Sequence, residues 1–163
     1  MTNAAPPTSK ARTSIGGVLL AAYVIVVLFA TMWPTPLDQG YGAAIEKVLD
    51  VVHRNGVPQW FGYNKLEFSA NILMFVPLGF LLTMLLPTRW WWLAVLVCPA
   101  LSIGIELTQA AALTARFATV SDVVANSLGA LIGIVCAVAI RAVVHARDEK
   151  VIDRALWQRS QRR

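Results

Sequence analysis

The sequence predicts an all-α integral membrane protein, built as a bundle of four membrane-spanning helices. Its 163 residues are 57% hydrophobic and only 14% charged, whereas a soluble domain typically carries about a quarter charged residues. The apolar residues also fall into four long runs, each close to the roughly 20 residues that a helix needs to cross the hydrocarbon of a bilayer. We expect these spans at about residues 15–33, 69–86, 91–112 and 122–144.

The first span follows a polar tail, residues 1–14, which carries Lys10 and Arg12. Its apolar run is longer than the core of about 7–15 residues found in a cleaved signal peptide. It also ends in Trp33-Pro34 rather than in small residues. We therefore expect the run to remain in the protein as a span, with Trp33 at the depth of the lipid head groups.

The segment between the first and second spans contains a short amphipathic helix over residues 41–54. Charged residues occupy one face of this helix, and apolar residues at helical spacing occupy the other: Ile45, Val48, Leu49 and Val52. Asn55-Gly56, followed by Pro58, is typical of a helix end. Such a helix lies on the membrane surface or covers the mouth of the bundle. We interpret His53 within it as a solvated surface residue rather than a ligand.

The second and third spans each contain a proline. Pro77 removes a backbone donor and is followed closely by Gly79, so we expect a bend in the second span there. Pro99 interrupts the middle of the third span. Between the two spans, Arg89 and the tryptophans at 90–92 stand where an aromatic belt of a membrane protein is found.

The fourth span is expected to begin at Ser121, whose hydroxyl can cap the helix. Gly129 and Gly133, extended backward by Ala125, form a small-residue pattern that predicts close approach of another helix. Residues 146–163 form a basic tail, either a short helix on the membrane surface or a disordered segment. Two cysteines inside apolar runs, Cys98 and Cys136, indicate packing rather than a disulfide.

The distribution of lysine and arginine predicts that both termini are cytoplasmic. Basic residues mark the cytoplasmic side of membrane proteins, and here they concentrate in the two tails and in the turn that contains Arg89. This topology in the cytoplasmic membrane places the loop 34–68 and the turn 111–120 outside. We therefore interpret the net charge of +5 as a topology signal and not as a sign of nucleic-acid binding.

Under this topology, six polar residues converge just inside the extracytoplasmic surface of the cytoplasmic membrane. An ionisable group at the bilayer centre costs a few kcal/mol even on lenient scales, so these groups are expected to face one another or a wet cavity. Arg116 can hold Glu106 and Asp122 by its planar fork, which argues against a metal between the two carboxylates, and no cofactor is implied. The candidate site residues are Asn71, Glu106, Gln109, Arg116, Asp122 and Asn126.

Taken in order, segments 71–79 and 102–109, Arg116 and segment 122–133 resemble the VanZ-like family in sequence and spacing. That family consists of small bacterial membrane proteins, and its namesake is associated with resistance to the glycopeptide teicoplanin. The resemblance covers roughly residues 33–133 and implies a VanZ-like transmembrane domain at 15–145, acting at the cell envelope. The polar positions belong to the family's signature, whereas the loop 34–68 does not.

Four hypotheses about function follow. In the first, an outer pocket lined by the polar residues binds or modulates a cell-wall precursor, a lipid head group or a glycopeptide. In the second, the protein is a small transporter or flippase for a lipid-linked substrate, oligomeric through the face of Gly129 and Gly133, although polar residues at one end give no path across the membrane.

The remaining two hypotheses use the same residues differently. An intramembrane enzyme would employ Glu106 and Asp122 for acid–base chemistry. Since no nucleophile–base pair is visible, catalysis is the less favoured alternative. In a purely structural role, the polar residues only hold the helix ends together.

Overall fold

The chain is all-helical, as the sequence predicts. A computed structural model describes residues 10–32, 37–112 and 119–161, and these residues form helices with no strand among them. The helices are α1 (Lys10–Thr31), α2 (Leu37–Arg54), α3 (Tyr63–Leu85), a short 3-10 helix η1 (Thr88–Trp90), α4 (Leu93–Ala112) and α5 (Val120–Ser160). Four of them, α1, α3, α4 and α5, are long and apolar enough to cross a membrane.

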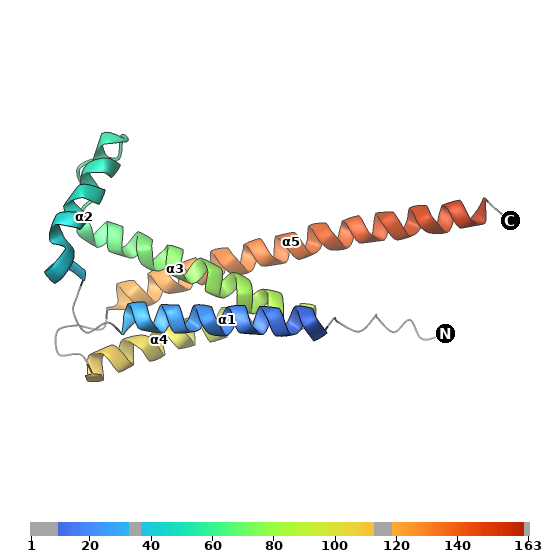
Figure 1. The fold of residues 1–163 in the computed structure, drawn as a ribbon, viewed down its shortest axis with the longest axis horizontal. Helices are drawn as coiled ribbons and strands as arrows, with labels where there is room; N and C mark the ends of the chain where they lie inside the picture. The colour runs from blue at the N-terminus through green and yellow to red at the C-terminus, as the bar shows by residue number, and fades with distance from the viewer. Residues whose placement is uncertain (1–9, 33–36, 113–118, 162–163) are drawn as a thin grey trace.

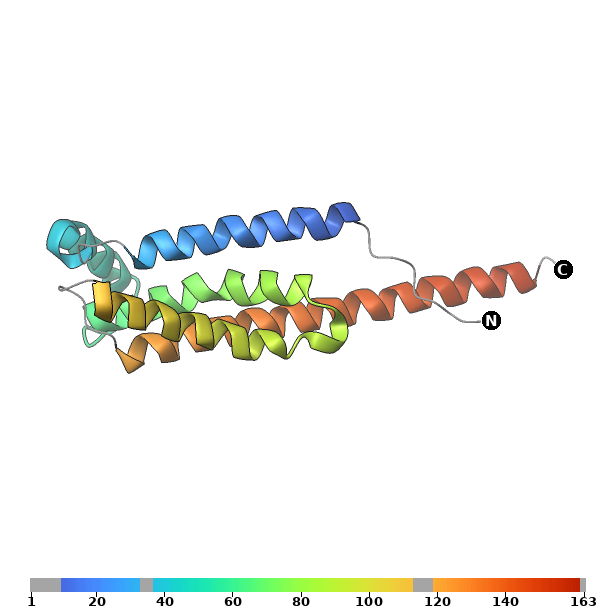
Figure 2. The ribbon, with the colours of Figure 1, turned by 90° about the horizontal axis from the view of Figure 1, so that it is seen from below.

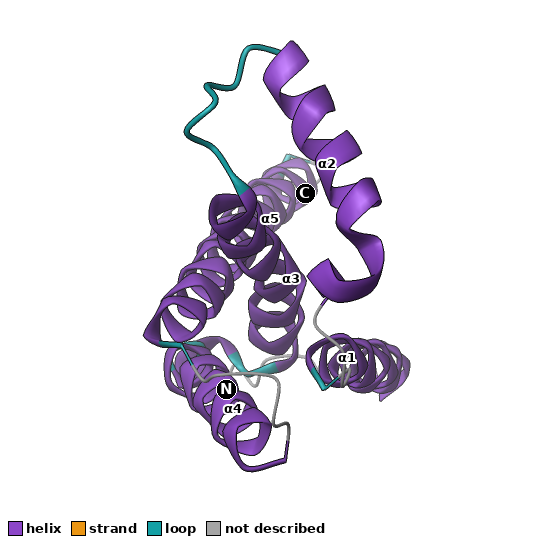
Figure 3. Ribbon diagram, turned by 90° about the vertical axis from the view of Figure 1, so that its left-hand side faces the viewer, coloured by secondary structure: helices purple, strands orange, loops and turns teal. Residues whose placement is uncertain are grey.

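Helix α3 occupies the centre of the bundle. It contacts α1, α2, α4 and α5, and its contact with α5 is the most extensive between any two elements. Seen from one end, α3 lies between α5 and α1, with α4 beside it (Figure 3). The start of α1 and the end of α5 lie at the same end of the bundle (Figures 1 and 2), as an even number of spans requires.

Helices α3 and α5 touch backbone to backbone along the glycines that the sequence singled out. A Cβ built on Gly129 would collide with the carbonyl of Ile72, and one on Gly133 would collide with that of Val76. From the other side, a Cβ on Gly79 would collide with the carbonyl of Ala130. The predicted close packing is therefore present, but it lies within the chain. In the described residues the glycine face is covered by α3, and self-association of the protein stays a prediction.

Helix α1 is held far more loosely. Most of its large apolar side chains are exposed, as expected of a surface that faces lipid, and Val27 is its one fully buried hydrophobic residue. Val27 packs in the core with Phe75 and Leu78 of α3. The Tyr23 hydroxyl donates a hydrogen bond to the Met74 carbonyl at 2.8 Å.

The fourth membrane helix is longer than the sequence indicates. We expected it to end near residue 144 and to be followed by a separate tail, but α5 continues unbroken to Ser160. Its 41 residues rise roughly 60 Å at about 1.5 Å per residue, twice the roughly 30 Å of a bilayer's hydrocarbon. Part of α5 must therefore extend beyond the membrane, and the long straight helix in Figure 1 shows this projection.

The other helix ends differ from the predictions by a few residues. The first span begins earlier, since α1 starts at Lys10, and α3 starts at Tyr63 rather than at residue 69. Pro77 and Pro99 lie inside α3 and α4, and both helices continue through their prolines. The prolines therefore do not divide these helices into separate segments, and the predicted interruption of the third span at Pro99 is wrong.

The amphipathic helix α2 lies outside the bundle, across its end (Figure 3). It begins at Leu37, four residues before the prediction, and ends in a Schellman motif. Gly56 has a φ of 95°, and Val57 N–H donates to the Val52 carbonyl at 3.3 Å. His53 is half-buried with Nε2 3.0 Å from the Phe61 carbonyl, so the prediction of a solvated side chain is wrong.

Candidate functional site

Five of the six predicted site residues lie at one end of the bundle, where α1 and α4 end and α3 and α5 begin. We call them, with their hydrogen-bond partners, the polar network. It comprises Asn71, Glu106, Gln109, Asp122 and Asn126 with Thr31, Ser102 and Thr119. Figure 2 shows the four helix termini together at this end, away from both ends of the chain. We refer to it as the network end.

The start of α5 is capped from two helices. Thr119 has an extended backbone, and its hydroxyl accepts a hydrogen bond from Asp122 N–H at 3.2 Å. In a common capping arrangement, a side chain three residues into the helix accepts the N–H of the capping residue in return. Here Glu106 of α4 takes that role, because its Oε2 accepts from Thr119 N–H at 3.0 Å. The predicted cap at Ser121 is therefore wrong, and the helix begins earlier.

Because Glu106 takes the capping role, the Asp122 carboxylate can bond elsewhere. Asn71 Nδ2 of α3 donates to Asp122 Oδ1 at 2.9 Å. Both carboxylates thus lie at the start of α5, where the first backbone N–H groups of a helix carry partial positive charge. Glu106 is only 6% exposed, while Asp122 is half-buried. Asp122 is therefore the carboxylate of the network that a ligand can reach.

Gln109 fastens the end of α1 to α4. Its Nε2 donates a 2.7 Å hydrogen bond to the carbonyl of Thr31, the last residue of α1. The last carbonyls of a helix have no partner within the helix, so the amide of Gln109 satisfies one of them. Gln109 is buried, and its role in the described structure is to position α1.

Asn126 and Ser102 join α5 to α4 one turn deeper. Asn126 Nδ2 donates to Ser102 Oγ at 2.9 Å, and both side chains are buried. The Asn126 Oδ1 atom has no hydrogen-bond partner among the described residues. This pair sits between two apolar helices, where an interhelical hydrogen bond is worth roughly 0.6 kcal/mol on average.

The sixth predicted residue, Arg116, lies outside the described residues. The predicted arrangement of Glu106 and Asp122 around its guanidinium is therefore untested, although both carboxylates are at the start of α5. No group of three or more His, Cys, Asp or Glu side chains that could hold a metal is found in the described ranges.

Sequence reasoning missed a second set of hydrogen bonds, which joins α3 and α5 at the opposite end of the pair. Arg141 Nη2 of α5 donates to the carbonyls of Met84 and Leu86 at 2.8 and 2.7 Å. Residues 123–140 between Asp122 and Arg141 carry no charge and rise roughly 27 Å, close to the thickness of the hydrocarbon. This spacing in the sequence could have indicated the role of Arg141, because it places Asp122 and Arg141 at the two ends of the span.

Four lipid-compatible helices, joined by polar side chains at the network end and by Arg141 at the other end of the α3–α5 pair, define a multi-pass membrane protein. The VanZ/LLP1 family matches residues 18–141, which cover the first span from Val18 onward, the second and third spans, and the fourth up to Arg141. The chain therefore belongs to this family, as its resemblance indicated. Neither a search of curated proteins nor one of solved structures returned a match.

Proposed function

We propose that this protein acts at the outer face of the cytoplasmic membrane, where the polar network binds or modulates a lipid-linked component of the cell envelope. The observation that carries the proposal is the pair of carboxylates at the start of α5. Glu106 and Asp122 lie in or beside apolar helices, where charge is costly and residues that carry it commonly serve function. Asp122 combines this position with partial exposure.

The charge distribution supports an outward-facing network end. The opposite end carries Lys10, Arg12, Arg89 and the extension of α5, in which Arg147, Lys150, Arg154 and Arg159 are accompanied by Asp148, Glu149 and Asp153. At the network end, Lys47, Arg54 and Lys65 are accompanied by Glu46, Asp50 and Glu67. Because arginine and lysine are retained on the cytoplasmic side, the balance favours cytoplasmic termini and an external network.

We further propose that binding at the network lowers susceptibility to glycopeptides such as teicoplanin. The support is the association of the family's namesake with teicoplanin resistance. If the network holds a lipid-linked component at the outer leaflet, the set of envelope components that the antibiotic encounters there changes. Binding is the chemistry that this site supports best, because the described part of the network contains hydrogen-bonded carboxylates and amides but no nucleophile beside a base.

The test is glycopeptide susceptibility in a sensitive bacterial host that expresses the protein. Glu106→Gln and Asp122→Asn keep an oxygen that can accept the bonds from Thr119 and Asn71, and they remove only the charge. Both variants, and Arg116→Ala, should insert normally and lose the protection that the wild type gives. Glu46→Gln and Asp50→Asn on α2 are matched controls, since they remove exposed carboxylates from the same end.

Two results would contradict the proposal. One is a wild-type protein that gives no protection, which removes the link to glycopeptides. The other is full protection by Glu106→Gln and Asp122→Asn. If those variants lower only the thermal stability of the detergent-purified protein, the network has the purely structural role of the fourth hypothesis.

A further inference from the structure

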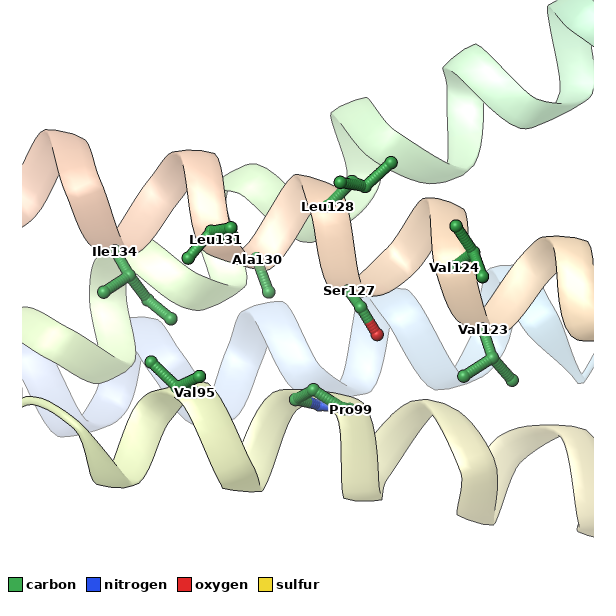
Figure 4. A pocket seen from close by; sticks show the side chains of 9 residues that line it. All are labelled: Val95, Pro99, Val123, Val124, Ser127, Leu128, Ala130, Leu131 and Ile134. Atoms are coloured by element: carbon green, nitrogen blue, oxygen red, sulfur yellow. The ribbon is translucent and has the colours of Figure 1, made fainter.

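A groove runs between α4 and α5, beginning on α5 beside the network end. Its volume is about 290 Å³, and its lining is almost wholly apolar. Val95 and Pro99 of α4 form one wall (Figure 4). Along α5 it extends from Val123 to Ile134, and the side chains of Ser127 and Ala130 point from α5 toward α4.

The groove exists because small residues face α4 where the two helices separate. Ala130 is 1% exposed and Ser127 is half-buried, so together they form a shallow floor. The rims are larger side chains, Leu128 and Leu131, which are 43% and 47% exposed. The hollow therefore opens sideways, toward the lipid that surrounds a membrane helix, and not toward the centre of the bundle.

The α5 wall of the groove is about as long as one leaflet is thick. From Val123 to Ile134 the helix rises roughly 16 Å at about 1.5 Å per residue, about half of a bilayer's hydrocarbon thickness of roughly 30 Å. The groove begins beside the half-buried Asp122 and passes the middle of the span between Asp122 and Arg141. On α4 it reaches Val95, two residues from the start of that helix.

We propose that this groove binds one acyl chain of a lipid whose head group lies at the Asp122 end. A straight hydrocarbon chain matches the apolar lining of the groove, its sideways opening and its length along α5. The volume equals roughly ten water molecules at about 30 Å³ each, which suits a row of methylene groups. A helix of a second protein copy is about 10–12 Å across and could insert only side chains.

The inference deepens the proposed function and rests on it for the head group, since it adds the tail of the ligand that the polar network would bind. In lipid, an apolar groove gains nothing from leaving water, so its affinity comes from close packing. A chain that fits this groove is selected by shape, and its head group is then selected at Asp122. The ligand class is an amphiphile with a long hydrocarbon chain.

The test uses the full chain in nanodiscs of phosphatidylglycerol and phosphatidylethanolamine, doped with a phospholipid that carries a photoreactive group on one acyl chain. Mass spectrometry of the labelled peptides locates the chain. We expect labelling of the groove residues Val95 and Leu131 to exceed labelling of Ile25, a lipid-facing residue of α1, several-fold. Equal labelling of the two surfaces would overturn the proposal.

Two variants sharpen the result. Ser127→Leu fills the groove and should reduce labelling of Leu131 to the level of Ile25. Cys136→Leu is the matched control, because Cys136 is an exposed residue of α5 outside the groove, and it should leave labelling unchanged. Undiminished labelling in Ser127→Leu would overturn the proposal. The wild-type labelling pattern decides the question even if Ser127→Leu does not fold.

Asp122→Asn separates this inference from the proposed function. If the variant keeps groove labelling but loses glycopeptide protection, both proposals stand. If it keeps both, the acyl-chain site stands and the function of the network fails. Even labelling of groove and α1 in a wild-type protein that protects cells would reject the groove and leave the proposed function intact.

Discussion

The α3–α5 pair and helix α1 are both apolar, yet they are held in different ways. The pair packs backbone against backbone at Gly79, Gly129 and Gly133, and polar bonds fasten it near both ends. Helix α1 relies on Val27, the Tyr23 hydroxyl and the bond from Gln109. Lipid tails are as apolar as leucine, so apolarity alone cannot choose between helix and lipid. Small residues and hydrogen bonds decide which helices form the stable centre.

Gly129→Ala should have the largest effect, because its new Cβ would collide with the Ile72 carbonyl and force α3 and α5 apart. We expect a loss of about 3 kcal/mol or more in the free energy of unfolding, measured by denaturant titration in detergent micelles. Gly104→Ala is the control, since Gly104 lies in α4 with open space around it. Equal stability of the two variants would mean that the α3–α5 contact is not close.

Arg141→Met should have the next largest effect. The change keeps an apolar stem but removes the bonds to the Met84 and Leu86 carbonyls. Because hydrogen bonds to a charged group contribute roughly 1.5–3 kcal/mol, we expect a loss of about 2 kcal/mol in the same titration. Arg147→Met, at an exposed position six residues later, should change little. A similar loss in both variants would show a general effect of charge.

Gln109→Leu should loosen α1 without disturbing the α3–α5 pair. It removes the bond to the Thr31 carbonyl, and we expect a loss of about 1 kcal/mol. Thr108→Val is a matched control because Thr108 is exposed and its hydroxyl donates to the Gly104 carbonyl of its own helix. If Thr108→Val costs as much, Gln109 does not position α1.

Two neighbouring valines of α1 should show the smallest effects. Val27 is fully buried against α3, while Val26 is 58% exposed. Val27→Ala should cost about 1 kcal/mol through lost packing, and Val26→Ala should remain within about 0.5 kcal/mol of the wild type. The denaturant titration in detergent micelles measures both free energies of unfolding. Equal values would mean that α1 has no preferred face toward the bundle.

The sequence predicted the elements better than their partners. Runs of apolar residues indicated four spans, and the GxxxG spacing indicated close packing at Gly129. Local pattern could not show that α3 of the same chain covers this face, since that depends on how the helices cross. For the same reason, Gln109 was placed at the correct end but its partner, the Thr31 carbonyl, could not be predicted. The long α5 was missed because residues 145–160, about four turns of the helix, are mostly polar, a composition that also suits a tail.

The position of the polar network on the outer side of the membrane is the claim on which the proposed function depends. Labelling of Ser121→Cys with a membrane-impermeant maleimide in intact cells tests it most directly, with both native cysteines replaced by alanine. Ser121 is exposed beside Asp122, and Ser160→Cys at the far end of α5 is the matched control. We predict that position 121 reacts in intact cells and that position 160 reacts only after the membrane is permeabilised. The reverse pattern would place the network in the cytoplasm and contradict the account.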